Sequence, residues 1–254
     1  MQLWTPEHSR TLLPAVAVMV LAAVILRFAI GKKAHNIRMI PFRILTAILI
    51  LLEIGKQVQS LRLGYDLYHL PFHFCSLFIF MLPSMALWRG KHSQTVYGIT
   101  AALCTATALL TLIYPNLIYS AWDVNHFYDN YFAFHTVAFH NIVIFQCILI
   151  IALYLHEPAE KGESWSCVLF TVCFCVVSAT MAQLLKTNFN NFFFCNIASL
   201  ESLRLSLQGS LGYGLTQVLY ILIVTVLDIL FVLGSYWLYR GLRALCMRKQ
   251  KVTA

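Results

Sequence analysis

Long apolar runs, each long enough to cross a bilayer as a helix, dominate the chain. A spanning helix needs about 20 mostly apolar residues, and seven stretches meet that requirement. They are residues 11–30, 41–60, 70–88, 96–114, 132–155, 166–186 and 213–239. Strands of a membrane β-barrel would instead alternate in segments of about ten residues. The pattern predicts an all-α membrane protein in which residues 1–254 form a single domain, a bundle of seven transmembrane helices.

The composition supports this prediction. Of the 254 residues, 60% are hydrophobic and 11% are charged, and the mean hydropathy is +0.74. Soluble domains carry about 45–50% apolar and about 25% charged residues, which excludes a water-soluble globule. We therefore expect a multi-pass integral membrane protein, located in the cytoplasmic membrane if the cell is bacterial.

The distribution of Lys and Arg predicts the orientation. Thirteen of the 18 Lys and Arg residues flank the loops on one side of the predicted bundle and the C-terminal tail. Because positive loops stay in the cytoplasm, we expect the N-terminus outside and the C-terminus in the cytoplasm. The net charge of +8 thus lies beside membrane spans, where it suits anionic headgroups. We expect membrane phospholipids as partners and no nucleic acid.

Polar side chains gather at the opposite, non-cytoplasmic ends of the predicted spans. Because polar groups inside a membrane are costly, they tend to mark functional cavities. The pattern predicts a polar cavity that opens to the non-cytoplasmic side, with residues 190–212 as an interfacial segment beside it. The residues expected to line it and to bind substrate are His73, His69, Glu53 and Asn188.

The sharpest local signal is the sequence LPFHFC at residues 70–75. Proline favours the first turn of a helix, so we expect a helix to begin near Pro71 and to hold His73 and Cys75 in its first turns. These two residues would point about 200° apart on such a helix. A base for the Cys75 thiol must then come from elsewhere, and His135 or His140 in residues 132–155 can supply it.

Two other interpretations remain open. His69 and His73, with His135 or His140, have the ligand types of a zinc site with an open position. Alternatively, the cavity binds a small ligand in a non-enzymatic transporter or receptor whose histidines couple to protons. The covalent interpretation has no metal and no cofactor, with Cys75, His140 and His135 as the catalytic residues.

The LPFHFC motif also carries a resemblance to a known family. The chain resembles the YwaF-like bacterial integral membrane proteins, which are related to eukaryotic transmembrane protein 164. Supporting matches are found along residues 4–240. They are Trp4 and His8, Glu53, Tyr97 with Gly98, the His-rich start of residues 132–155, and Thr187 to Phe189.

The resemblance implies a seven-helix fold and phospholipid acyl transfer through a thioester on the motif cysteine. That cysteine corresponds to Cys75 here, and the family histidine to His140. We therefore expect a lipid acyltransferase or lipid hydrolase that uses a cysteine nucleophile and a histidine base.

Overall fold

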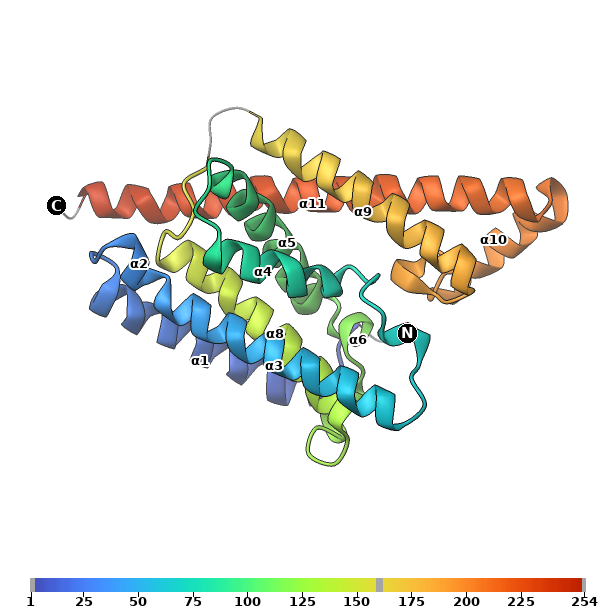
Figure 1. Ribbon diagram of the computed structural model, residues 1–254, viewed down its shortest axis with the longest axis horizontal. Coiled ribbons are helices and arrows are strands. Elements are labelled where there is room, and N and C mark those ends of the chain that lie inside the picture. The colour runs from blue at the N-terminus through green and yellow to red at the C-terminus, as the bar shows by residue number, and fades with distance from the viewer. Residues whose placement is uncertain (1–2, 159–161, 253–254) are drawn as a thin grey trace.

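The computed structural model describes residues 3–158 and 162–252, and every regular element in those two ranges is a helix (Figure 1). Besides three 3₁₀ turns, η1 (Leu67–His69), η2 (Cys75–Leu77) and η3 (Phe189–Asn191), the helices are as follows. They are α1 (Pro6–Ile30), α2 (His35–Arg38), α3 (Ile40–Arg62), α4 (Phe78–Leu87), α5 (Ser93–Ile113), α6 (Pro115–Ile118), α7 (Ala121–Asn125), α8 (Tyr131–Ala152), α9 (Glu163–Leu185), α10 (Ala198–Leu211) and α11 (Tyr213–Val252).

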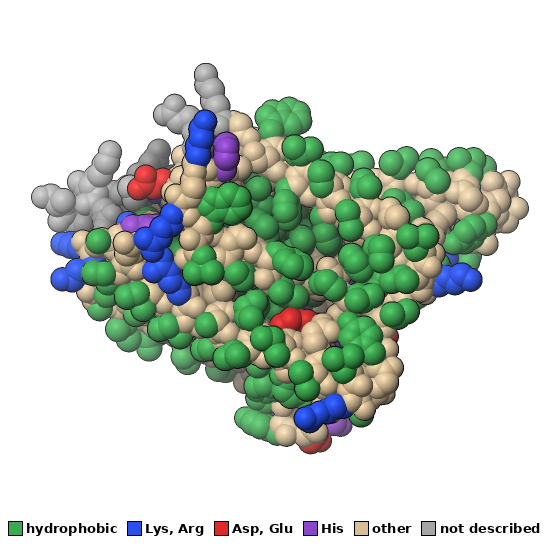
Figure 2. Space-filling view, in the orientation of Figure 1, with side chains coloured by type: hydrophobic (Ala, Val, Ile, Leu, Met, Phe, Trp, Pro, Cys, Tyr) green, Lys and Arg blue, Asp and Glu red, His purple; other side chains and the backbone are tan. Residues whose placement is uncertain are grey.

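Within the described ranges, five helices are long and apolar enough to cross a membrane: α1, α5, α8, α9 and α11. Hydrophobic side chains are spread over the whole face seen in Figure 2, as expected of a surface that contacts lipid. The chain is therefore a multi-pass membrane protein, as its composition predicts.

The other two expected spans differ from these five. Helix α3 has 23 residues but carries Arg43, Glu53 and Lys56. The apolar helix at residues 75–87 is shorter than the run 70–88 that suggested it. Residues 70–74 are not helical, because the backbone N–H of Phe72 donates to Leu70 O and the Phe72 carbonyl accepts from Ser178 Oγ at 2.7 Å. The expected helix start at Pro71 is wrong, and helical structure begins at Cys75.

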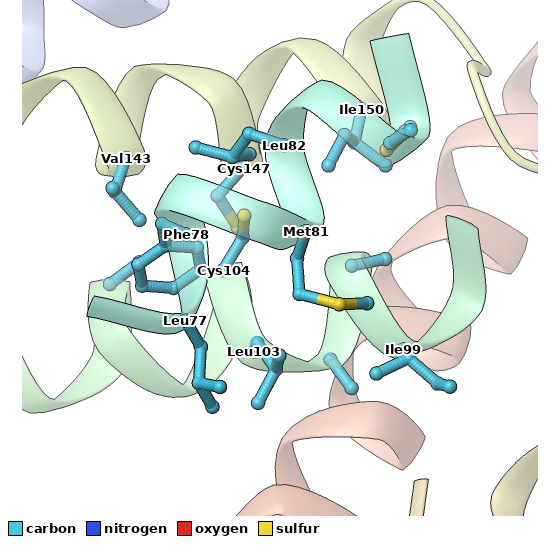
Figure 3. Close-up of a cluster of buried hydrophobic side chains, with 14 of the residues drawn as sticks. Leu77, Phe78, Met81, Leu82, Ile99, Leu103, Cys104, Val143, Cys147 and Ile150 are labelled. Carbon is cyan, nitrogen blue, oxygen red and sulfur yellow. The ribbon is translucent and has the colours of Figure 1, made fainter. Parts of the chain in front are cut away.

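Helix α5 is the centre of the bundle. Small residues from Gly98 to Ala108 are buried along its length, and small side chains let neighbouring helices approach closely. The core that α4, α5 and α8 share includes Phe78, Leu103 and Val143, all fully or almost fully buried (Figure 3).

Helices α3 and α8 are joined by contacts near both of their ends. Near one end, Gln146 donates to Thr46 Oγ1 at 2.9 Å. Near the other, the Tyr131 hydroxyl donates to Leu52 O at 3.0 Å and lies over Gly55, where an added Cβ would fall 2.0 Å from that hydroxyl. Gly55 therefore permits the close approach that brings the start of α8 against α3.

One end of the molecule, which we call the basic end, comprises α2, residues 88–92, residues 153–158 and the C-terminal part of α11 (Figure 1). Arg38 of α2 donates to the carbonyls of Leu153 and Tyr154, and the Tyr154 hydroxyl donates to Cys246 O. Lys and Arg side chains are concentrated toward this end in Figure 2. Segments expected on the cytoplasmic side thus lie together.

The opposite end, which we call the polar end, joins the remaining connections. His8 of α1 contacts Tyr119 O at 2.9 Å, and the His69 ring stacks on Phe132 at 4.8 Å between centroids. Phe72 packs edge-on against Phe189. Helix α10 is exposed along its length and precedes α11 at this end, consistent with the interfacial segment expected at residues 190–212.

Candidate functional site

Glu53, near the polar end of α3, is the centre of a buried polar cluster. Its side chain contacts Lys56 Nζ at 2.7 Å, Gln57 Nε2 at 2.8 Å and His135 Nε2 at 3.1 Å. The side chains of Glu53 and His135 are each 8% exposed. A carboxylate at this depth is costly unless it is paired, and the Lys56 and His135 contacts supply that pairing.

The positive charge of Lys56 acts on most of the predicted site residues. It lies within electrostatic range of Cys75, of His69 and His73 in the α3–α4 connection, and of His135 and His140 on α8. Lys56 lies three residues after Glu53, so the two side chains are neighbours on one face of α3. The i+3 spacing of this pair is a local signal, whereas the contact of Glu53 with His135 of α8 depends on the tertiary fold.

The α3–α4 connection is fixed by hydrogen bonds to α3. Ser60 Oγ lies 2.6 Å from His69 Nδ1, and Gln57 Nε2 donates to His69 O at 2.9 Å. Burial and the nearby Lys56 ammonium hold the pKa of His69 below its usual range, so the ring is neutral at pH 7. His73 is held separately, by a contact of its Nε2 with Tyr68 O at 3.0 Å.

Cys75 begins η2, directly after this connection, and is partly buried. The charges of Lys56 and Glu53 both act on its thiol. No hydrogen bond joins its Sγ to a histidine among the residues that the structure describes. The structure thus places Cys75 near the Glu53 cluster without forming a cysteine–histidine dyad.

The two histidines of α8 have defined tautomers. The Nδ1 atom of His140 lies 2.7 Å from Thr136 O. Because a carbonyl only accepts, Nδ1 carries the proton and the neutral ring keeps its lone pair on Nε2. His135 presents Nε2 to the Glu53 carboxylate, which leaves its lone pair on Nδ1. Both rings therefore retain one nitrogen that can accept a proton.

Asn188 has its polar atoms engaged within its own loop. Its Oδ1 accepts from the N–H groups of Phe193 and Phe194, both at 3.1 Å, and its Nδ2 donates to Asn196 Oδ1 at 3.3 Å. The loop that it holds presents Phe189, whose ring packs against His73 at 5.4 Å. Asn188 thus shapes the polar end through its loop, whereas its expected substrate contact would need these bonds to change.

The described residues contain no group of three His, Cys, Asp or Glu side chains placed to hold a metal ion. His69 and His73 turn to different partners, Ser60 and Tyr68. The arrangement therefore does not bring together the histidine zinc site considered from the sequence.

A second buried polar cluster lies near the basic end, and the sequence pattern did not reveal it. His156 contacts Glu163 Oε1 at 2.6 Å and the Tyr239 hydroxyl at 2.9 Å, and the Tyr236 hydroxyl donates to Glu163 Oε2 at 2.7 Å. All four side chains are at most 3% exposed. Their spacing over more than 80 residues gives no local signal.

Asp228, in the apolar helix α11, is also paired. It accepts from Asn190 Nδ2 at 2.8 Å and from the Cys175 thiol at 3.6 Å. These contacts tie α11 to η3 and to α9, so Asp228 has a structural explanation.

A bundle of apolar helices with a buried carboxylate, lysine and histidine cluster at one end defines a multi-pass membrane protein with a polar site at one end of the bundle. Residues 3–239 match the TMEM164 family. The match covers most of the chain, which belongs to that family, and it confirms the resemblance to transmembrane protein 164. No curated protein and no solved structure matches the chain.

Proposed function

We propose that this TMEM164-family protein is a membrane-embedded lipid acyltransferase or lipid hydrolase, with Cys75 as its nucleophile. The observation that carries the proposal is the arrangement of the polar end: Cys75 directly follows a connection that is anchored to α3 through His69, and Glu53 of the same helix contacts His135 of α8. A nearby ammonium group helps to offset the cost of forming a thiolate in partly buried surroundings.

The proposed reaction has two steps. The Cys75 sulfur attacks the ester carbonyl of a phospholipid, its proton passes to a histidine, and the lipid alcohol leaves with that proton as the acyl thioester forms. An acceptor hydroxyl, or water in the hydrolase version, then attacks the thioester and returns the proton to sulfur. Covalent catalysis of this kind replaces one difficult step by two easier ones.

His140 and His135 are the two candidate bases, and their hydrogen bonds give them different strengths. His135 is oriented by the Glu53 carboxylate, which would stabilise an imidazolium, whereas His140 is oriented by a neutral carbonyl. The carboxylate–histidine arrangement is the one that orients the base in hydrolytic triads. Either ring needs Cys75 to approach it, which substrate binding at the polar end would have to bring about.

We also propose how many times the chain crosses the membrane and in which direction. Helix α3 and the segment at residues 70–88 complete seven crossings, with the polar end and the N-terminus outside and the basic end in the cytoplasm. The positive-inside rule and the grouping of alternate connections at opposite ends support this topology. In a bacterial cell the membrane would be the cytoplasmic one.

The test is intact mass spectrometry of the full chain after incubation with vesicles of dioleoylphosphatidylcholine and dioleoylphosphatidylethanolamine. We expect a single oleoyl adduct that maps to Cys75 and is released by neutral hydroxylamine. C75A should lose the adduct, and C75S should trap a hydroxylamine-resistant ester, because a hydroxyl is the weaker nucleophile and its oxyester is less reactive.

C173A is the matched control, because Cys173 is an exposed cysteine of α9 and belongs to no polar cluster described above. Its adduct should equal that of the native chain. H135A and H140A should each slow adduct formation, and the larger effect identifies the base. Undiminished acylation and lipid turnover in C75A would overturn the proposal and favour a transporter or receptor that binds lipid without reaction.

A further inference from the structure

A hollow of about 310 Å³ lies at the basic end, at the opposite end of the molecule from the Cys75 site. Segments from three parts of the chain form it: α2, the residues around the start of α5, and the connection after α8. Its lining comprises His35, Arg38, Arg89, Ser93, Gln94, Tyr97, Leu155 and Glu157. Its volume is at the lower end of the range for small-molecule sites, so it suits a headgroup rather than a whole lipid.

The lining carries an excess of positive charge. It includes two guanidinium groups, those of Arg38 and Arg89, and one carboxylate, that of Glu157. Arg43 acts on the same region, because burial, Arg38 and Arg43 together hold the pKa of His35 below its usual range. The charge balance therefore favours an anion with more than one negative charge.

The hollow is held in shape by hydrogen bonds. Arg38 Nη1 donates to the carbonyls of Leu153 and Tyr154 at 2.7 and 3.1 Å, which fixes its side chain. The N–H of Glu157 donates to Gln94 Oε1 at 3.2 Å, and the ring of His35 stacks on Tyr97. These contacts fix the Arg38 guanidinium before any ligand arrives, which lowers the entropic cost of binding.

Two kinds of donor remain for an anion. The Nε–H of Arg38 is buried and has no partner within the described part of the chain, and a buried donor without a partner is costly. Gln94 lies in the first turn of α5, a helix of 21 residues, where N–H groups without an intrahelical partner and the helix dipole favour negative charge; the N–H of Ser93 itself donates to Gly90 O. Arginine pairs with phosphate through two parallel hydrogen bonds.

We propose that this hollow binds a phosphate group, that of an anionic lipid headgroup in the cytoplasmic leaflet. The location supports a lipid source, because α2 follows the end of α1 and the hollow reaches the first residues of α5, and both α1 and α5 are long and apolar enough to cross a membrane. Basic pockets between spans on this side of a membrane suit phosphorylated headgroups. The site is separate from the Cys75 site and makes no use of its chemistry.

The experiment measures thermal stabilisation of the full chain in detergent, titrated with dioctanoyl phosphatidate, dioctanoyl phosphatidylcholine or inorganic phosphate. The C75A background prevents any turnover of the added lipid. A ligand that binds only the folded state raises Tm with its concentration, which gives an apparent Kd. We expect phosphatidate to stabilise the protein and phosphatidylcholine not to.

Three variants test whether the charges that line the hollow bind the phosphate group. R89Q should weaken phosphatidate binding by about tenfold, the usual scale for a lost charge-assisted hydrogen bond. E157Q should strengthen binding, because it removes the opposing carboxylate and leaves the backbone bond to Gln94 intact. K91Q is the matched control: it removes one positive charge two residues from Arg89 but lies outside the lining.

Equal stabilisation by inorganic phosphate, with the same response to R89Q and E157Q, would identify a soluble phosphate compound as the ligand. Stabilisation by phosphatidate alone would identify the lipid. The proposal is overturned if neither binds, or if K91Q weakens binding as much as R89Q does.

Discussion

The stability of Glu53 variants depends on the cost of leaving the Lys56 ammonium group buried without a partner. Glu53 pairs with Lys56 at 2.7 Å, and the two side chains are 8% and 13% exposed. E53L leaves the ammonium group buried without its carboxylate, a loss of about 3–5 kcal/mol for buried pairs. We expect a large fall in Tm in detergent and lower yield.

The double variant E53L/K56M isolates the cause. Replacing a buried pair by apolar residues of similar size is often neutral or stabilising, so the double variant should recover most of the lost stability while remaining inactive. If E53L alone is as stable as the native chain, the pair is solvated and Glu53 is an interfacial residue.

Gly98 is the second residue whose size the structure fixes. An added Cβ would lie 2.1 Å from Glu163 Oε1, inside the cluster that also contains His156 and Tyr236. G98A should destabilise the protein by about 1–3 kcal/mol, as overpacking does. G234A is the control: nothing lies within 4 Å of its Cβ, and alanine favours a helix by about 0.5–1 kcal/mol. Equal Tm values for the two variants would contradict this packing.

At the scale of elements, the loop after α9 depends on one amide. Asn188 Oδ1 accepts from two backbone N–H groups, those of Phe193 and Phe194. N188A removes the acceptor of both partly buried N–H groups, which then lose their hydrogen bonds within the loop, whereas N188D keeps two acceptor oxygens. We expect hydrogen exchange at residues 189–196 to accelerate in N188A and to stay slow in N188D. Equal protection in both variants would contradict this role for Asn188.

The sequence predicted whole elements better than their contacts. Apolar runs located α1, α5, α8 and α9 to within a few residues, because the bilayer sets the length of a spanning helix. The apolar run at residues 70–88 predicted a helix that is too long at its start. Before Cys75, a hydrogen bond from the Ser178 hydroxyl to Phe72 O keeps the backbone from forming a helix. That bond joins residues 106 positions apart, so no local pattern could reveal it.

For the candidate site, too, the sequence predicted local pairs of residues but not contacts between helices. The i+3 spacing of Glu53 and Lys56 is local and was visible in the sequence. The contact of His135 with Glu53 depends on how α8 packs on α3, through Gly55 and Tyr131. The relation of Cys75 to either α8 histidine likewise belongs to tertiary structure.

At the scale of the whole molecule, the two ends predict how the chain is oriented. Single cysteines at Lys91, in the basic end, and at Asp129, in the polar end, should be labelled from opposite sides by an impermeant maleimide in a background without reactive native cysteines. We expect the cysteine at position 129 to react with the maleimide from outside, and the cysteine at position 91 to react only after the membrane is permeabilised. Labelling of both positions from one side would refute the alternation of connections, and exchanged reactivity would refute the orientation.

The cluster of Glu163 with Tyr236 also constrains the order in which the protein is made. Glu163 begins α9, and the hydroxyl that it accepts from is synthesised 73 residues later, in the final helix. While the ribosome is still translating α10, Glu163 has His156 as a partner but lacks Tyr236, so α9 cannot settle in its final environment. Completion of the basic end must therefore wait for α11. Chains released before residue 236 would carry an incompletely paired carboxylate into the membrane, which is the kind of defect that quality-control proteases can recognise.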